Sequence, residues 1–475
     1  MRVCWRLLSF NEGIFPHQLK TAKIIPIFKA NDPMKFNNYR PISLLPVLSK
    51  IFEKLMYTRL IKFINKFKLL HKLQFGFREG HSTCMALMIL LDKITHALDN
   101  GNYAIGIFLD FRKAFDTVNH NILISKLYTY GVRGIALDWF KSYLTNRLQY
   151  VSYNDTNSDT KTVLCGVPQG SILGPLLFLL YINDLVNVSK HLLSVLFADD
   201  TNSFLTGRDL NSMVSIINTE LDAVVGWLNA NKLSLNVDKT NYMIFAPKGK
   251  STDHQGIYIS GKQINEVERT KFLGVILDNN LTWAHHICYI RNKISKAIGS
   301  ILKARKVFNT ATLVQLYNAL IYPYYTYCIN IWGGTYQTHL QKLVILQKKV
   351  VRILYGAKPR THSLPLFKSM GILQLHEIFI YNVGLFMYKF TRNMVPPIFD
   401  MFNYVTDVHQ RPTRQSELLY IPLCRTKRSQ MTIRYTGPSL WNQIAILFDV
   451  NCSISSFKKY LKSALSEIKH VSMYT

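Results

Sequence analysis

The segment YAIGIFLD, residues 103–110, decides the fold of this chain. Seven residues without a charged side chain lead into an aspartate, a pattern typical of a buried β-strand that carries a carboxylate at its end. The segment LLSVLFADD, residues 192–200, repeats the pattern and ends in two aspartates. Residues 201–205 (TNSFL) follow directly, and we expect them to return as the second arm of a hairpin. If the two apolar strands are neighbours in one sheet, the three aspartates meet at one edge of it.

These aspartates, Asp110, Asp199 and Asp200, suit phosphoryl transfer. In that reaction the protein mainly positions the reactants, and carboxylates hold two magnesium ions about 3.5–4 Å apart. Mg²⁺ prefers oxygen ligands and keeps several waters, so two or three aspartates suffice. For the Asp-Asp pair alone a plain turn is the simpler interpretation, because Asp favours turns by bonding its own backbone.

The flanking sequence predicts an α+β body followed by a helical extension. Five prolines within the first 46 residues predict short strands and loops, with one helix from about residue 48. Ser82 and Thr83 are expected to cap a helix that runs to about residue 98. The other expected elements are a buried element at 172–182, a helix at 210–228, a short strand at 271–277 (KFLGVIL) and mainly helices beyond 278. One of these later helices is basic, with Arg291, Lys293, Lys296, Lys303, Arg305 and Lys306.

The net charge of +29, from 57 Lys and Arg against 28 Asp and Glu in 475 residues, favours a polyanionic partner. A basic surface without a partner is the alternative. Seven widely spaced cysteines without a Cys-x-x-Cys pair indicate a reducing compartment and argue against a zinc ribbon. We interpret His285, His286 and Cys288 as ordinary helix residues rather than metal ligands, and no apolar run is long enough to predict a membrane span.

Six motifs in order carry a family resemblance. They are YRPIS at 39–43, QFGFR at 74–78, FLDFRKAFD at 108–116, GVPQGSILGP at 166–175, FADD at 197–200 and FLGV at 272–275. Together they resemble the reverse transcriptase domain of non-LTR (LINE-type, jockey/CR1-like) retrotransposons, from about residue 15 to 278 and more loosely through RYTGP at 434–438. Telomerases and intron-encoded maturases fit the YRPIS and FADD surroundings less well, and an independent phosphatase or nuclease would leave the GVPQG loop without a task.

The resemblance implies an α+β right-hand polymerase. Its parts would be fingers with the first palm-supporting helices at 1–102, a palm of antiparallel sheet plus helices with inserted finger elements at 103–278, a helical thumb at 279–360, and a C-terminal helical, basic extension at 361–475. The reverse transcriptase domain itself would span about 7–278.

The resemblance also implies roles for single residues. Asp110, Asp199 and Asp200 would be the catalytic ligands of two Mg²⁺ ions, with Mn²⁺ as a substitute. The residues that would bind the nucleotide are Lys29, Arg40 and Arg78 on the triphosphate, Phe115 under the sugar, Gln169 and Gly170 in the loop against nucleotide and template, and Lys239 as general acid for pyrophosphate. Phe272, Leu273 and Gly274 would form the hairpin that holds the primer end.

Plainer interpretations of these residues stay open. Phe115 would also suit the core, the Gln169–Gly170 loop would also suit a turn built for its own sake, and any lysine or arginine would also suit a solvated face. The basic helix, with Tyr289 and Phe308 near it, would suit the minor groove of an RNA–DNA hybrid, or a plain amphipathic helix.

The implied function is an RNA-directed DNA polymerase of a retrotransposon, which adds deoxynucleotides to a primer 3′-OH by two-metal phosphoryl transfer. Its partners would be an RNA template, a DNA primer and deoxynucleoside triphosphates, without a membrane; the family implies an intracellular, nuclear setting. Neither an endonuclease nor a Cys/His knuckle is recognisable, so we expect a fragment whose endonuclease acts in trans or is encoded further upstream. The alternative is a catalytically idle remnant that still binds nucleic acid.

Overall fold

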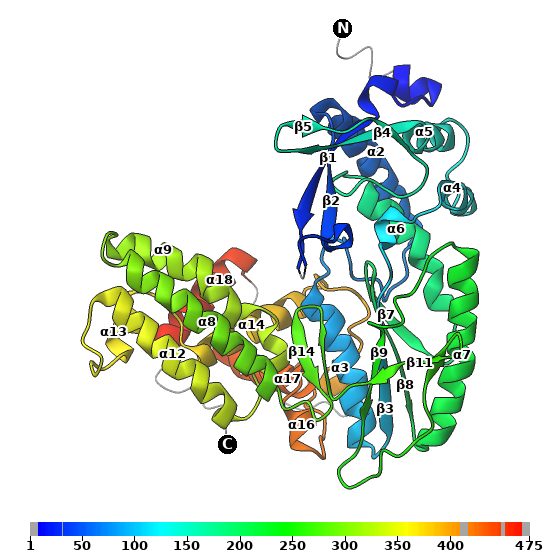
Figure 1. Cartoon of the computed structure of the whole chain (residues 1–475). Helices are drawn as coiled ribbons and strands as arrows, with labels where there is room; N and C mark the ends of the chain where they lie inside the picture. Colours follow the sequence, from blue (N-terminus) through cyan, green and yellow to red (C-terminus); the bar gives the residue numbers. More distant parts are fainter. Residues whose placement is uncertain (1–7, 31, 409–416, 448–451, 468–475) are drawn as a thin grey trace.

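A sheet of five strands, a second sheet above it and a group of helices beside it make up the computed structural model of the chain (Figure 1). The structure describes residues 8–30, 32–408, 417–447 and 452–467. The prediction of an α+β fold is confirmed. The domain boundaries expected at 102, 278 and 360 stay predictions, and Cys4 lies outside the described residues.

The lower sheet, which we call the palm sheet, has the strand order β12-β9-β3-β8-β7. Its strands are β3 (Tyr103–Leu109), β7 (Leu193–Phe197), β8 (Asp200–Gly207), β9 (Asn241–Phe245) and β12 (Asn265–Glu266). The predicted strands at 103–109 and 192–198 and the predicted return arm are all present. The two apolar strands are not neighbours, however, because β8 lies between them and pairs antiparallel with both. β3 and β7 therefore run parallel, and their carboxyl ends still reach the same edge.

The central strand of the palm sheet, β3, is buried on both faces. Along β3, Tyr103, Ile105, Ile107 and Leu109 pack into one core cluster, and Ala104 and Phe108 pack into the other. The first cluster lies against the helices α6 (Gly174–Ile182) and α7 (Leu210–Ala230), as predicted for 172–182 and 210–228. The second contains α3 (Thr83–Asp99) and most of the helices beyond residue 283. Alternate residues thus enter opposite cores, as the two-residue period of a strand requires.

The upper sheet, the fingers sheet, joins two distant parts of the sequence. β1 (Thr21–Phe28) pairs antiparallel with β2 (Tyr39–Leu44) and parallel with β4 (Arg147–Tyr153). Short strands β5 (Thr156–Asn157) and β6 (Lys161–Val163) complete it. The adjoining helices are α2 (Val47–Lys66), which begins where predicted, α4 (His120–Thr129) and α5 (Ile135–Leu144). Short 3₁₀ turns lie at His17–Leu19, Phe36–Asn38, Ala114–Asp116 and Asn183–Asn187.

Residues 271–277 were predicted as one strand, and that prediction is wrong. The segment folds as a hairpin of β13 (Arg269–Phe272) and β14 (Val275–Asp278). Leu273 and Gly274 form its turn with φ of 45° and 80°. An apolar run of this length fits one buried strand as well as two short arms, and the positive φ that glycine allows makes the turn. A two-stranded β10 (Tyr258–Ile259) and β11 (Lys262–Gln263) pair lies nearby.

The helical region extends to one side of the palm and then returns to it (Figure 1). Its helices are α8 (Ala284–Ala304), α9 (Thr310–Leu320), α10 (Tyr322–Thr326), α11 (Ile329–Trp332), α12 (Gln337–Tyr355), α13 (Leu364–Ser369), α14 (Leu375–Thr391), α15 (Val405–Val408), α16 (Lys427–Gln430), α17 (Ile433–Leu447) and α18 (Ile454–Glu467). Their apolar side chains form one cluster with α3, so this region shares its core with the palm.

Helix α3, in the first quarter of the sequence, packs against α17, near the end of the sequence. The Ser82 hydroxyl accepts a hydrogen bond from the Met85 N–H, which confirms the predicted cap. Farther along, the buried carboxylate of Asp92 receives two hydrogen bonds from Arg434 of α17, at 2.5 and 2.7 Å. This contact places the RYTGP motif against the back of the palm.

We expect Arg434→Met to lower the free energy of unfolding by about 3–5 kcal/mol, because it leaves the Asp92 carboxylate buried without a partner. Chemical denaturation followed by circular dichroism measures the loss. The double variant Asp92→Leu/Arg434→Met should regain most of it, and Arg425→Met, on a neighbouring exposed side chain, should change little. A single variant as stable as the original chain would contradict the importance of this pair.

Candidate active site

Three aspartates meet at the upper edge of the palm sheet. Asp110 directly follows β3, Asp200 is the first residue of β8, and Asp199 lies in the turn between β7 and β8. The backbone of Asp110 is fixed on both sides, since its N–H donates to Thr240 Oγ1 at 3.3 Å and its carbonyl accepts from Asn236 at 2.7 Å. The meeting of the carboxylates at one edge, predicted from the strand pattern, is therefore present.

The three carboxylates interact electrostatically. Burial raises the pKa of Asp199 most, and the charge of Asp110 raises it further. The Asp200 side chain is exposed. Desolvation by the surrounding protein nevertheless raises its pKa to about 6, and the charges of Asp199 and Asp110 raise it further. Close like charges disfavour each other's ionisation, which is the situation that a bound cation relieves.

Two cations of the fingers act on this cluster. Lys29 follows β1, and Arg40 lies in β2 opposite Ile27. The positive charges of Arg40 and Lys29 lower the pKa of Asp199, and Lys29 does the same for Asp200. Both side chains are exposed. The fold thus brings the two predicted triphosphate ligands to the side of the carboxylates.

The donor set fits a magnesium ion, which needs few protein ligands. No group of three His, Cys, Asp or Glu side chains within the described ranges is arranged to enclose a metal by itself. Mg²⁺ is usually held by one or two carboxylates, with water and substrate phosphates supplying the other oxygens. Asp110 and Asp199, on parallel strand ends and electrostatically coupled, match that requirement.

Gln74, to which the sequence assigned no role, supports the turn that carries Asp199. Its fully buried side chain accepts hydrogen bonds through Oε1 from the N–H groups of Gly76 and Ala198, at 2.9 and 3.0 Å. Ala198 has a φ of 59°, a conformation that costs a residue with a Cβ roughly 1–2 kcal/mol. A Cβ on Gly76 would come within 2.3 Å of the Ala198 nitrogen. The QFGFR motif was the signal that could have pointed to this support.

Arg78, predicted to bind the triphosphate, holds this same segment. Its Nη1 donates to the carbonyls of His71 and Gln74, both at 2.9 Å. Burial lowers its pKa from the ordinary value of an arginine. The Nη1 group of Arg78 is therefore occupied by two backbone carbonyls.

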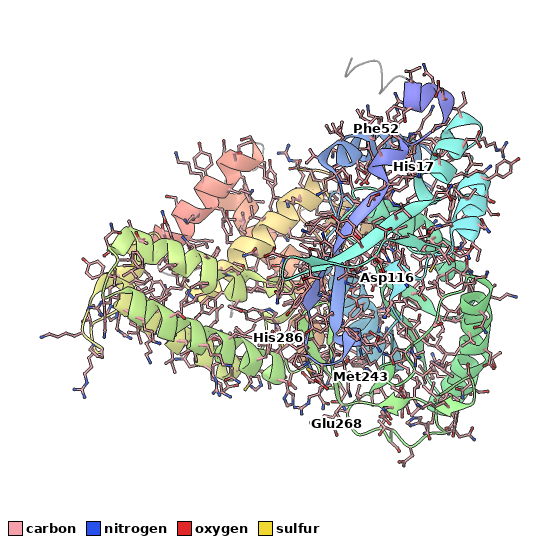
Figure 2. The ribbon with its side chains drawn as sticks, turned by 45° about the horizontal axis from the view of Figure 1, so that its top comes forward. His17, Phe52, Asp116, Met243, Glu268 and His286 are labelled. Atoms are coloured by element: carbon pink, nitrogen blue, oxygen red, sulfur yellow. The ribbon has the colours of Figure 1, made fainter. Side chains whose placement is uncertain are left out.

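The loop of the GVPQG motif joins the fingers to the palm. The Gln169 side chain donates to Asp116 Oδ1 at 2.8 Å, and its carbonyl accepts from the Ser43 N–H at 2.8 Å. Gly170 has a φ of 121°, and a Cβ there would lie 2.6 Å from the Ser43 carbonyl oxygen. Asp116 lies near the middle of the molecule in Figure 2, and burial raises its pKa while Gln169 opposes the shift. No role for Asp116 follows from the sequence, although this residue ends the motif that begins at Phe108.

Phe115 lies partly buried beside this loop. Its ring stacks on Phe178 of α6 with centroids 4.3 Å apart and meets Phe77 edge-on at 6.2 Å. The backbone carbonyl of Phe115 accepts from the Val167 N–H at 2.8 Å. The ring is thus fixed from behind while part of it stays open to solvent.

Lys239 is exposed and lies in the turn between α7 and β9. The residues before it form a turn in which its N–H donates to the Asn236 carbonyl. It lies at the same end of the sheet as the three aspartates, since Asn236 also bonds the Asp110 backbone.

The turn of the β13–β14 hairpin is attached to the helical region. The Tyr327 hydroxyl donates to the Leu273 carbonyl at 2.7 Å and is hydrogen-bonded to the Thr83 hydroxyl at 3.1 Å. A Cβ on Gly274 would lie 3.0 Å from the Tyr327 ring. Phe272 packs against Phe108 of β3 with centroids 5.4 Å apart. All three predicted primer-grip residues therefore lie between the palm sheet and the helices.

The remaining predictions concern cysteines, histidines and the basic helix. The six described cysteines carry free thiols. His286 is buried against Trp332, and burial lowers its pKa to about 4, so it is a neutral packing residue. Arg291, Lys293, Lys296 and Lys303 are exposed on α8, where the three lysines form one basic face, while Arg305 and Lys306 follow the helix. Among the described residues, no helix combines the length and apolarity needed to cross a membrane.

Comparison with known proteins supplies a family. The model of "Reverse transcriptase (RNA-dependent DNA polymerase)" matches residues 27–277. The RNA-directed DNA polymerase from mobile element jockey of Drosophila melanogaster is 32% identical over 357 residues, 73% of this chain and 38% of that protein. The probable RNA-directed DNA polymerase from transposon X-element of the same species is 32% identical over 374 residues, 76% of this chain and 40% of that protein. The chain thus spans about two fifths of the length of these relatives.

Among solved structures, apo telomerase from Candida tropicalis superposes with a TM-score of 0.43 and 10% identity. The superposition covers 84% of this chain and 71% of that chain.

We expect Gln74→Leu to accelerate amide hydrogen exchange in the peptide that spans β7 and its turn, because the N–H groups of Gly76 and Ala198 lose their acceptor. Leaving two buried donors unpaired should cost about 2–4 kcal/mol of stability. Gln18→Leu, which changes an exposed side chain in the same way, is the matched control. Unchanged exchange in the Gln74 variant would show that the turn needs no such support.

Proposed function

The chain belongs to the reverse transcriptase (RNA-dependent DNA polymerase) family, as its sequence motifs implied, and on that premise we propose that it adds deoxynucleotides to a primer 3′-OH on an RNA template. The observation that carries the proposal is the meeting of Asp110, Asp199 and Asp200 at one edge of the palm sheet, within electrostatic reach of Lys29 and Arg40. The names of the relatives, RNA-directed DNA polymerases of mobile elements, support it.

Asp110 and Asp199 would hold the divalent metal ions, with Asp200 beside them. Reverse transcriptases generally use divalent metals; we propose two Mg²⁺ ions here, which Mn²⁺ could replace. When bound, such ions neutralise phosphate charge and make the primer hydroxyl a better nucleophile. The protein contributes the fixed position of both carboxylates, through the paired backbone of Asp110 and the supported turn of Asp199.

The triphosphate would lie between the carboxylates and the fingers. Arg40 offers a planar, bidentate guanidinium and Lys29 a point charge, and both already act on the carboxylates. Arg78 contributes indirectly in this proposal, because its hydrogen bonds to His71 and Gln74 keep the QFGFR segment in place. Lys239, exposed at the same end of the sheet, would donate a proton to the departing pyrophosphate.

Phe115 and the GVPQG loop would position the sugar and base. Phe178 supports the Phe115 ring from behind, so the ring cannot move away from a ribose 2′-OH. Gly170 lets the loop approach Ser43 of β2 more closely than any side chain would permit. This contact keeps Gln169 between the fingers and Asp116, where template and nucleotide would meet.

The primer and the nascent hybrid would extend from the carboxylates towards the helices. Phe272, Leu273 and Gly274 would hold the primer end, since Tyr327 fixes their turn. The exposed basic face of α8 would follow the backbone of the RNA–DNA hybrid. An endonuclease to expose the primer would come from another protein or another part of the same one.

We expect Asp199→Asn to reduce extension of a DNA primer on an RNA template by at least about 1000-fold, because it removes a metal ligand and a charge. Hybrid binding should stay nearly unchanged. Asp238→Asn, on an exposed residue paired with Lys262, is the matched control and should extend normally. Tight, salt-sensitive binding without extension by the original chain would contradict the proposal and leave a nucleic-acid-binding protein.

We expect Phe115→Ala to lower the preference for deoxynucleotides over ribonucleotides by about 10- to 100-fold, because the ring no longer excludes the 2′-OH. The ratio of kcat/KM for the two nucleotides measures the preference. Phe77→Ala removes a ring that meets Phe115 only edge-on and should leave most of the preference intact. An unchanged ratio in the Phe115 variant would assign that ring to packing alone.

A further inference from the structure

A second hollow lies at the end of the palm sheet that is farthest from the aspartates. It has a volume of about 480 Å³ and is lined by the loop after β9, by the residues after β14, by Tyr336 and by Arg428. An adjoining hollow of about 260 Å³ shares Tyr336 and Met431 with it. We call the two together the far groove.

The position of the far groove follows from strand register. Asp110 ends β3 at the catalytic edge, and Phe245, which precedes the lining residue Ala246, pairs with Ala104 at the other end of β3. Seven residues of strand separate the two ends, about 23 Å at the usual rise. Figure 2 shows Glu268, whose carbonyl accepts from the lining residue Asn279, at the lower end of the molecule, well away from Asp116.

Arg428 is the distinctive residue of the far groove. It is half-buried, and burial lowers its pKa while the charges of Tyr336 and Asp278 oppose that shift. The Asp278 carboxylate also accepts from the N–H groups of Thr282 and Trp283, both at 2.9 Å. Because this one carboxylate is shared and the groove also carries Lys248 and Lys250, the position favours a further anion.

The charge of the lining strengthens this requirement. The lining residues of both hollows include no Asp or Glu. Lys248 and Lys250 flank Gly249 in the loop after β9, and Lys248 is exposed. Lys250 is held at the rim, since its Nζ donates to the Gly101 carbonyl at 2.8 Å and lies 5.1 Å from the Tyr103 ring centroid. The groove therefore offers a fixed positive field.

Tyr336 adds a surface for bases. It lies between the two hollows, immediately before α12, and 46% of it is exposed. Asn279 and Asn280 add amide groups on one wall. Basic residues along a hollow that contains an aromatic ring are the means by which proteins hold a single nucleic-acid strand, whereas a duplex is too wide to enter a hollow of this size.

We propose that the far groove binds a single strand of nucleic acid about 23 Å from the catalytic aspartates. The proposal rests on the proposed function only for the identity of that strand, which we assign to the unpaired template tail that leaves a short hybrid. The hairpin of β13 and β14 spans the gap, since its turn lies by Tyr327 and β14 leads directly into Asn279. At about 3.4 Å per base pair, roughly seven base pairs of hybrid span this distance, so the tail that leaves a short hybrid would emerge beside the groove.

The experiment measures how much a tail adds to binding. Full-length chain is titrated, at fixed salt and without nucleotides, with a fluorescent 10-base-pair RNA–DNA hybrid whose RNA 3′ tail is 0, 4 or 12 nucleotides long. The 12-nucleotide tail should tighten Kd about 10-fold over the blunt hybrid, since base stacking on an aromatic ring and phosphate contacts with cations both strengthen binding of a single strand. The 4-nucleotide tail should add less, because fewer of its nucleotides can occupy the groove.

Two variants and two controls locate the effect. Arg428→Gln and Tyr336→Leu should each remove most of the gain from the 12-nucleotide tail and leave Kd for the blunt hybrid unchanged. Arg425→Gln and Tyr355→Leu change exposed residues of the same types outside the lining, and should keep the gain. Because Asp278 keeps its hydrogen bonds from Thr282 and Trp283, Arg428→Gln should lower Tm little, and the measured Tm separates lost binding from lost folding.

Several outcomes would overturn the proposal. These are no gain from the tail, an equal gain in all variants, or stronger competition by polyglutamate than by a 12-nucleotide RNA, which would assign the groove to an acidic peptide. The result does not depend on catalysis. A chain that fails to extend primers but shows the expected tail effect would refute the polymerase and retain the groove, and the reverse result would do the opposite.

Discussion

Three carboxylates that repel one another lie at one edge of the palm sheet, and the rest of the structure has to hold them there. Asp110, Asp199 and Asp200 lie close enough for their charges to shift one another's pKa. Left to themselves, the strand ends that carry them would separate. They stay together because β8 is bonded on both sides, and because Gln74 and Thr240 fix the backbone on either flank. Burial of both faces of β3 supplies the stability for this arrangement.

The sequence predicted those parts of the fold that local pattern determines. The apolar runs of β3 and β7, the Ser82 cap and the spacing of α7 each depend on neighbouring residues, and all are present. The insertion of β8 between the two apolar strands was missed, because a run of residues does not specify which strand it pairs with. The apolar pattern at 271–277 predicted one strand, because it does not show that a glycine with positive φ divides the segment into two arms; only the family resemblance implied a hairpin there.

In the candidate site, too, local features were predicted from the sequence and contacts between distant residues were not. The three aspartates were predicted from strand ends and from family motifs, and the structure brings them together. Gln74 carries no charge and lies in no periodic pattern, so its role appears only when the backbone of Ala198 lies beside it. Arg78 resembles a phosphate ligand in sequence, yet its hydrogen bonds are local. Arg428 was one basic residue among many until the structure placed it in a hollow without acidic lining residues. The roles assigned to the nucleotide and primer ligands stay predictions.

The contact of Asp92 with Arg434 joins residues 342 positions apart, and this has a consequence for biogenesis. Twelve of the 17 residues of α3 are buried, largely in a core that it shares with later helices. At about 5–20 residues per second, a ribosome needs roughly 17–70 s to reach Arg434 after Asp92 has been made. During that time the part of the α3 surface that α16 and α17 cover in the folded chain stays uncovered. Synthesis of this protein therefore passes through a stage at which this apolar surface is open to chaperones and to aggregation.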